Sequence, residues 1–482
     1  MSLTRRILSS SGQLMAANAL ARALGIVSLP LLTQWLAPSA YGQAAIASTL
    51  ISLVSVIGLA GMDMSYARGF LSRDQPNGEA VETLLWRLAV IAALVSGAVA
   101  AGIWLAYASQ DPRAITGIAA LVFLGAAGSL LLAMAQTRSR LHNRHGRLAL
   151  AVAAGGVLSI ATTLFLAKQV VPDERALVIG YVVAYLVPIA LIGLPAWRQV
   201  SMPSGLSMAH RRSVLLIGLP GVVMAPMYWI LSSSDRWFLQ AWRDSEVVGL
   251  YAVACAFGQL GMMVNSALIA IWLPEATRVH EATGGADGDR AIGRLFVRLL
   301  LVMMLVWLAM STVGGDLLRL LTNKQFHAGA GLVPWISSAV FFYGVYHLAN
   351  TGLFLGRRLT WSAAALAAAG CISLGANAVL IPHFGAMAAA VVQCATFASL
   401  ATVVWALAQR IYPLPLPTRR ISIAFAFTLV VVVAGSRMPP VADTASASTK
   451  AVFLVIVCAA VVWLMEPGVL RRRRRKPYSA NA

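Results

Sequence analysis

Residues 88–107 have the sequence LAVIAALVSGAVAAGIWLAY, a run of twenty residues without a charged side chain. As an α-helix, such a segment is about 30 Å long, which matches the hydrocarbon core of a bilayer. Similar apolar segments fill the rest of the chain, and short breaks between them carry the charges. Transmembrane strands would instead show alternating segments of about ten residues. The pattern therefore predicts an all-α, polytopic membrane protein.

The composition of the 482-residue chain excludes a soluble protein. Hydrophobic residues make up 59% and charged residues only 11%, whereas soluble globular proteins have about 25% charged residues. The net charge is +20, but the basic residues lie in short breaks and not on a folded polar surface, so nucleic-acid binding is not expected. The four cysteines lie inside apolar segments without a CxxC pair, and we expect them to pack as small apolar side chains.

About fourteen apolar segments are predicted to cross the membrane as helices. The first has no convincing cleavage site, so it is interpreted as an uncleaved span and not as a signal peptide. The predicted spans cover residues 11–36, 41–62, 84–107, 115–136, 148–170, 177–197, 214–234, 247–273, 294–315, 330–355, 360–381, 385–408, 421–436 and 451–466.

The distribution of Lys and Arg predicts the orientation of these spans. With the N-terminus inside, 27 of the 37 basic residues fall in inward segments, including the tail Arg471–Lys476, and 9 fall in outward segments. Both termini are therefore predicted to be cytoplasmic. The remaining basic residue, Arg22, lies within the first span. No outward loop is long enough to form a domain, so we expect function inside the helix bundle.

The chain repeats itself weakly at a spacing of about 210 residues. Residues 41–47 (YGQAAIA) resemble residues 248–254 (VGLYAVA) at an offset of 207. This offset corresponds to six spans, and an even number keeps the orientation, so the sequence predicts a parallel repeat about the membrane normal. We expect three parts: a six-helix half, a second six-helix half facing it across a central cavity, and two further helices with a basic tail. They are predicted over residues 1–212, 213–412 and 413–482.

Five further features occur along the chain in a recognisable order. They are Arg22–Thr33, the L-x-P-x-x-Y-G turn Leu36–Gly42, Gly61–Arg68, the pair Ser234–Leu239 and Val248–Ala254, and the I-P-x-x-G turn in Ile381–Ala386. Together they resemble the polysaccharide-transport family of the multidrug/oligosaccharidyl-lipid/polysaccharide (MOP) exporter superfamily, to which multidrug and toxin extrusion (MATE) exporters also belong.

The resemblance implies a MATE-like fold and a non-enzymatic function. Such a protein would flip undecaprenyl-pyrophosphate-linked oligosaccharide repeat units across the bacterial inner membrane by alternating access, for O-antigen, capsule or exopolysaccharide synthesis. Its partners would be the lipid-linked oligosaccharide, membrane lipids and polysaccharide polymerase or export machinery. No cofactor, metal or nucleic acid is expected.

Arg22 is the one basic residue predicted to lie deep in the membrane, and Asn18 shares its helix face at i−4. A charge at that depth is costly and is therefore usually functional. We interpret Arg22 and Asn18 as substrate-cavity residues that contact a pyrophosphate or acidic sugar. The alternative is a structural Arg that bonds neighbouring carbonyls or extends to the cytoplasmic side.

Two charged pairs lie near the ends of predicted spans. Asp235 and Arg236 follow a span that two prolines are expected to kink. They form either a cavity or gate site or a simple charge pair at a helix end. Asp63 and Arg68 close the second span on its inner side. They form either a gate at the cytoplasmic mouth or a feature that only orients the span.

A polar stripe lies in the tenth predicted span, where Tyr343, Tyr346, His347 and Asn350 fall at i, i+3, i+4 and i+7. Aromatic faces and amides suit carbohydrate rings, so Tyr343, His347 and Asn350 are candidate substrate-cavity residues. Hydrogen bonding between helices is the structural alternative.

Three other functions remain as alternatives. A lipid II flippase would need a more basic cavity than one deep Arg provides. A MATE-type drug exporter would need carboxylates in the cavity, whereas the acidic residues here lie in loops or near helix ends. A membrane polysaccharide polymerase or ligase would need a large external loop, which the sequence lacks.

Overall fold

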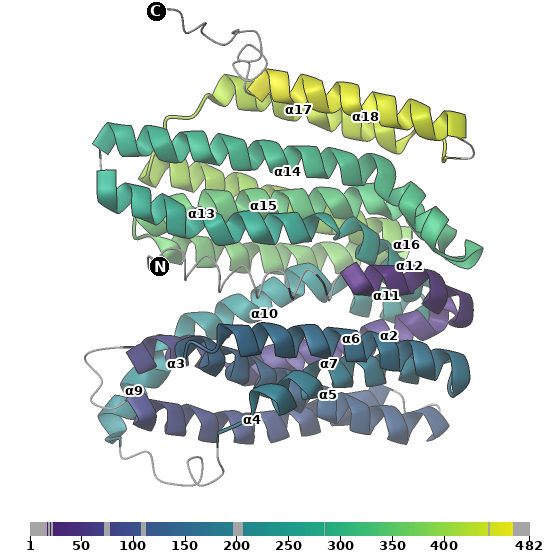
Figure 1. Ribbon diagram of the computed structural model, residues 1–482, viewed down its shortest axis with the longest axis vertical. Coiled ribbons are helices and arrows are strands. Elements are labelled where there is room, and N and C mark those ends of the chain that lie inside the picture. Colours follow the sequence, from purple (N-terminus) through teal and green to yellow (C-terminus); the bar gives the residue numbers. More distant parts are fainter. Residues whose placement is uncertain are drawn as a thin grey trace, which may run out of the picture. The chain divides into compact units, whose positions relative to one another are not determined.

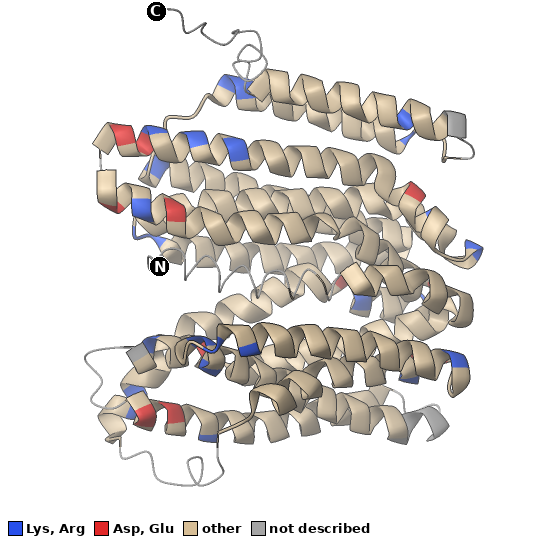
Figure 2. Cartoon of the chain, in the orientation of Figure 1, with Lys and Arg blue, Asp and Glu red and all other residues tan. Residues whose placement is uncertain are grey.

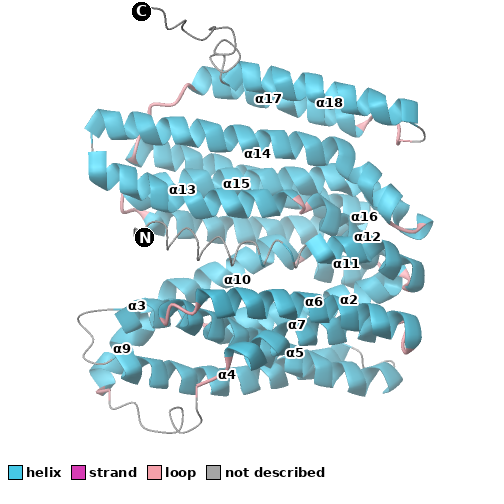
Figure 3. Cartoon of the chain, viewed as in Figure 1, coloured by secondary structure: helices cyan, strands magenta, loops and turns pink. Residues whose placement is uncertain are grey.

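The computed structural model describes residues 17, 20, 23–71, 78–107, 112–195, 206–283, 285–441 and 444–465. Within these ranges every regular element is a helix, and no strand occurs (Figures 1 and 3). The all-α class predicted from the apolar segments is therefore confirmed.

Eleven of the described helices are long and apolar enough to cross a membrane, or twelve if one bent pair counts as a span. The chain is thus a multi-pass membrane protein. The helices are α2 (Pro38–Leu59), α3 (Met62–Leu71), α4 (Gly78–Tyr107), α5 (Pro112–Leu141), α6 (His145–Gln169), α7 (Glu174–Ile192), α9 (Met208–Ile217), α10 (Leu219–Ser233), α11 (Asp235–Trp242), α12 (Ser245–Gly258), α13 (Gly261–Thr283), α14 (Gly285–Leu321), η1 (Lys324–Leu332), α15 (Val333–Leu355), α16 (Leu359–Ile411), α17 (Thr418–Ser436) and α18 (Thr444–Met465).

This number differs from fourteen at identifiable places. Only the short helix Ala23–Trp35 represents the first predicted span within the described residues. The single helix α16 covers the two predicted spans 360–381 and 385–408, and Gly385 interrupts it with φ 59° and ψ −139°. Such a backbone conformation is accessible to glycine because it has no Cβ. The predicted count of fourteen crossings stays a prediction.

The surface of the helices fits a lipid environment. Large apolar side chains are exposed along the helix middles, as at Ile91 (57%), Leu158 (48%) and Ile372 (65%). Figure 2 shows that the charged residues lie mainly towards the helix ends, while long central stretches carry none. Both features are expected where hydrocarbon surrounds the middle of each helix and water reaches its ends.

The chain divides into two compact units that do not follow the chain order. Unit 1 comprises Met1–Ala252 and Gly370–Ala386, and unit 2 comprises Val253–Ala369 and Met387–Ala482. The core of unit 1 includes the fully buried Tyr66 and Trp86. The predicted three-part division at residues 212 and 412 stays a prediction.

The last two helices belong to the core of unit 2. Val431 of α17 and Val461 of α18 are buried in the same cluster as Trp307 of α14. Trp307 also stacks on Phe341 of α15 at a centroid distance of 4.3 Å. Nearer the C-terminal end of α14, Asp316 forms an ion pair of 2.6 Å with Lys450, and both side chains are only 12% exposed. These contacts attach α17 and α18 to the helices that precede them.

Candidate functional site

Two of the predicted cavity residues, Arg22 and Asn18, lie outside the described residues. Their predicted contact with an anionic headgroup therefore stays a prediction.

Asp235 and Arg236 lie at the start of α11, inside unit 1. The Asp235 side chain is only 3% exposed. The Tyr251 hydroxyl donates a hydrogen bond to its Oδ2, and the backbone N–H of Arg236 donates to its Oδ1 at 2.9 Å. The Arg236 guanidinium carbon lies 6.0 Å from the centroid of the Tyr251 ring. The buried carboxylate thus links α11 to α12, and its role as a gate or headgroup site stays a prediction.

Burial raises the pKa of the Asp235 carboxyl, and the charge of Arg236 and the Tyr251 hydroxyl offset only part of this effect. The folded protein therefore binds this proton more tightly than the unfolded chain does. The free energy of unfolding should fall as pH rises from about 4 through the raised pKa, and stay lowered above it.

Asp235→Asn should remove this pH dependence, because an amide keeps an acceptor oxygen for Tyr251 but does not titrate in this range. Thermal unfolding of the detergent-solubilised protein at a series of pH values measures the difference. The wild type should lose stability relative to the variant as pH rises. If the unfolding temperatures of the two proteins change with pH in the same way, ionisation of the Asp235 carboxyl does not destabilise the fold.

The polar stripe of α15 is present and lies in unit 2. The His347 ring makes edge contacts with Tyr343 at 4.4 Å and with Tyr346 at 4.9 Å between centroids. The Tyr346 hydroxyl lies 3.3 Å from the Ser362 hydroxyl of α16. Asn350 Oδ1 is buried and accepts no hydrogen bond from the described residues. The stripe therefore combines rings in edge-to-face contact with an acceptor that has no hydrogen-bond partner among the described residues.

A groove of about 330 Å³ lies on another side of α15, also within unit 2. Its walls come from four helices and are mainly apolar. The lining residues are Leu300 and Met304 of α14, Phe341, Phe342 and Val345 of α15, Ala401, Thr402 and Trp405 of α16, and Thr418, Ile421, Ser422 and Phe425 of α17. At 3.6 residues per turn, the groove residues of α15 lie on roughly the opposite face of that helix from Tyr343, His347 and Asn350.

Sequence analysis missed this groove. Its aromatic residues Phe341, Trp405 and Phe425 lie in three different predicted spans. No local spacing relates them, and an apolar side chain facing a groove has the same character as one facing lipid.

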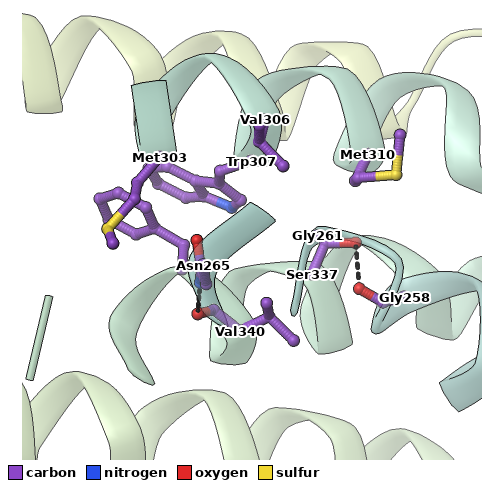
Figure 4. A pocket seen from close by; sticks show the side chains of 10 residues that line it. Gly258, Gly261, Asn265, Met303, Val306, Trp307, Met310, Ser337 and Val340 are labelled. Carbon is purple, nitrogen blue, oxygen red and sulfur yellow. Dashed lines mark hydrogen bonds between the residues drawn. The ribbon is translucent and has the colours of Figure 1, made fainter. Parts of the chain in front are cut away.

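A second cavity, at the bend between α12 and α13, is too small for a substrate. It holds about 10 Å³, enough for one water molecule at most. Figure 4 shows Asn265 and Ser337 beside it. Asn265 Nδ2 donates to the carbonyl of Val340 at 2.7 Å, and Ser337 Oγ donates to the carbonyl of Gly258 at 3.4 Å. The Ser337 bond satisfies the carbonyl of Gly258 where α12 and α13 meet at a bend of 49°, and the Asn265 bond joins α13 to α15.

The predicted cytoplasmic mouth contains more charge than Asp63 and Arg68. Asp63 is half-buried and interacts electrostatically with Arg140, whereas Arg68 is exposed. In the same unit, Glu82 of α4 accepts a hydrogen bond from Arg138 Nε at 2.7 Å. Because these pairs join α3 and α4 to α5, they stabilise the contacts among these three helices of unit 1. A gating role for Asp63 and Arg68 stays a prediction.

The described residues include no group of three or more His, Cys, Asp or Glu side chains that could hold a metal ion. The chemistry that the described sites offer is binding: an apolar groove, a stripe of rings and amides, and paired charges at the helix ends.

Solved structures of membrane exporters share this fold. The lipid II flippase MurJ in an inward closed conformation aligns with a TM-score of 0.65 at 11% identity, over 95% of this chain and 99% of that one. An inward-facing MATE transporter of the MOP superfamily aligns with a TM-score of 0.57 at 12% identity, over 82% and 95%. The Vibrio cholerae MATE transporter VcmN in its bent form gives 0.52 at 15% identity, over 85% and 98%. The fold is therefore that of the MOP exporters.

The family follows from the sequence itself. The profile of a family described as "Polysaccharide biosynthesis protein" matches residues 31–313, which is more than half of the chain. The chain belongs to this polysaccharide biosynthesis protein family, and the predicted family resemblance is confirmed. No individually curated protein matches the sequence.

Proposed function

We propose that this protein is a flippase that moves undecaprenyl-pyrophosphate-linked oligosaccharide repeat units across the bacterial inner membrane. The product would serve the synthesis of a surface polysaccharide such as O-antigen, capsule or exopolysaccharide. Membership of the polysaccharide biosynthesis family and the exporter fold support this proposal. The protein would work by alternating access and without chemical catalysis, alongside a polysaccharide polymerase or export machinery.

The observation that carries the proposal is the division of α15 into two faces. One face lines the apolar groove, through Phe341, Phe342 and Val345. The opposite face carries the polar stripe of Tyr343, His347 and Asn350. A lipid-linked sugar is itself divided in this way, because its isoprenoid tail is apolar and its glycan is polar. One helix can therefore hold both parts of such a substrate in different environments.

Each part of the substrate has matching chemistry in the chain. The groove can cover isoprene units by van der Waals packing, because a tail that moves in from the bilayer is already out of water. The rings of Tyr343 and His347 offer faces for sugar stacking, and Asn350 Oδ1 can accept a hydrogen bond from a sugar hydroxyl. Arg22 would pair with the pyrophosphate, as a cation in an apolar span can.

A drug exporter of the MATE type fits less well. Selecting cationic drugs requires an available carboxylate in the cavity. Among the described residues, Asp235 is the least exposed carboxylate. Its oxygens already accept hydrogen bonds from Tyr251 and from the backbone N–H of Arg236. A lipid II flippase shares the tail and pyrophosphate chemistry and remains the nearest alternative.

Deletion of the gene in its native bacterium tests the function. Lipid-linked repeat units should accumulate on the cytoplasmic leaflet, where glycosidases added to intact spheroplasts cannot reach them. The surface glycan should disappear. A plasmid carrying the wild-type gene should restore both. The proposal fails if the deletion strain keeps its surface glycan and becomes sensitive to cationic drugs. It also fails if peptidoglycan precursors accumulate in place of glycan repeat units.

A further inference from the structure

Two glycines bring α2 and the first turns of α12 into backbone contact inside unit 1. A Cβ atom added to Gly42 would lie 1.8 Å from the carbonyl oxygen of Ser245 and 3.1 Å from the backbone N of Gly249. A Cβ atom added to Gly249 would lie 1.8 Å from the carbonyl oxygen of Pro38 and 3.0 Å from the backbone N of Gly42. No side chain fits at either position, because the obstacle is backbone and cannot rotate away.

The contact is reciprocal, and its two sides are related by the sequence repeat. Gly42 and Gly249 are separated by 207 residues, and so are Pro38 and Ser245. This is the offset at which residues 41–47 resemble residues 248–254. Pro38 precedes Gly42 by four residues, and Ser245 precedes Gly249 by four. Each glycine contacts the carbonyl of the residue that lies four positions before the other glycine. The contact therefore lies on the local two-fold axis that relates the two copies of the motif.

The position of this contact in the membrane follows from the predicted orientation. Both α2 and α12 begin directly after a segment that is predicted to lie on the outer side of the membrane. A polar bond accompanies the glycines, since Gln43 Nε2 donates to Ser245 Oγ at 2.6 Å. We call Pro38, Gly42, Gln43, Ser245 and Gly249 the glycine joint. It holds the outer ends of the two repeats together.

We propose that the glycine joint is the outer gate of the transport cycle: it closes by backbone contact and must separate to open the outer side. The inference rests on the proposed alternating-access function. Because the two helices meet without side chains, the closed state needs glycine at both positions. Even one methyl group prevents closure, so it shifts the population towards the separated state.

Spin labels can measure this separation without any substrate. Ser39 and Glu246 flank the joint, are exposed, and also differ by 207 residues. Cysteines at these two positions, in a protein whose four native cysteines are replaced by serine or alanine, carry the labels in proteoliposomes. Double electron–electron resonance then reports the distance distribution between α2 and α12. We expect one short distance with native glycines.

Gly42→Ala and Gly249→Ala should each raise the ratio of separated to closed molecules at least about tenfold, which corresponds to ~1.4 kcal/mol. Ser245→Ala should act in the same direction but more weakly, because it removes one hydrogen bond and adds no clash. In vesicles, both glycine variants should also flip lipid-linked substrate more slowly, because the closed outer gate is part of the cycle.

Two other glycines provide matched controls. A Cβ on Gly102 of α4 meets nothing within 4 Å, so Gly102→Ala should leave the distances unchanged and should not lower the thermal stability. A Cβ on Gly155 of α6 would lie 2.6 Å from the Pro188 ring of α7. This clash should lower the unfolding temperature of Gly155→Ala. Because both helices belong to the first predicted half, the distance between the labels should stay unchanged.

The outcomes separate this inference from the proposed function. If folded Gly42→Ala and Gly249→Ala proteins keep the wild-type distance distribution, the glycine joint is not a gate. An equally large change in the distance distribution of Gly155→Ala would also overturn the inference, because it would show that any destabilised helix contact separates the labels. If both joint variants shift but the wild type flips no lipid-linked oligosaccharide, the proposed function fails and the gate stands.

Discussion

Thr402→Trp should reduce transport of lipid-linked oligosaccharide by at least about tenfold, which corresponds to ~1.4 kcal/mol. Thr402 is exposed on α16 and lines the apolar groove. An indole at this position would occupy space that we assign to the isoprenoid tail. Because the side chain is not part of a packed core, the substitution should fill the groove with little strain. Flipping of a fluorescent lipid-linked sugar in proteoliposomes measures the effect.

Val403→Trp is the matched control. Val403 is the next residue along α16, is 48% exposed and does not line the groove. This variant should transport at the wild-type rate. Thr402→Val tests the hydroxyl alone and should also be active, since it adds no bulk. Equal activity of Thr402→Trp and Val403→Trp would show that the groove does not hold the tail.

Arg22→Ala should abolish restoration of the surface glycan in the deletion strain. Arg22 is the one basic residue predicted to lie deep within an apolar span, and the alanine variant cannot compensate the charge of a pyrophosphate. Arg22→Lys should restore partial function, because a lysine keeps the charge but lacks the planar donor pair. Quantified surface polysaccharide, at matched protein levels in the membrane, provides the measurement.

Arg290→Ala controls for the loss of an arginine in general. Arg290 is 63% exposed and pairs with the exposed Asp287 within its own helix turn, so its removal should leave transport unchanged. If Arg22→Ala restores the glycan as well as Arg290→Ala does, Arg22 is a structural residue.

The helical membrane fold and the family could be predicted from local sequence. An apolar segment long enough to span a bilayer must be helical, because its backbone groups find no other partners in hydrocarbon. The segment 88–107 accordingly lies within α4. The stripe of Tyr343, His347 and Asn350 lies on one face of α15 because helical periodicity is a local property. The order of the family motifs needed no structure either.

Burial and partners could not be predicted in the same way. The sequence leaves Asp235 as either a cavity or gate site or part of a charge pair at a helix end, and only the packing of α11 against α12 shows that Tyr251 covers its carboxylate. The groove needed four helices to meet. The identity of a residue does not specify which neighbours from distant parts of the chain will surround it.

The glycine joint combines both sources of information. The weak similarity of residues 41–47 to residues 248–254 predicts a parallel repeat from the sequence alone. The tertiary structure shows that the two copies contact each other through Gly42 and Gly249, at a distance that leaves no room for a Cβ atom. Sequence alone determined a basic, helical membrane protein of this family, because hydrophobic length and charge placement act locally. The groove, the covered carboxylate and the glycine joint were decided by tertiary packing, because each exists only where helices distant in the chain meet.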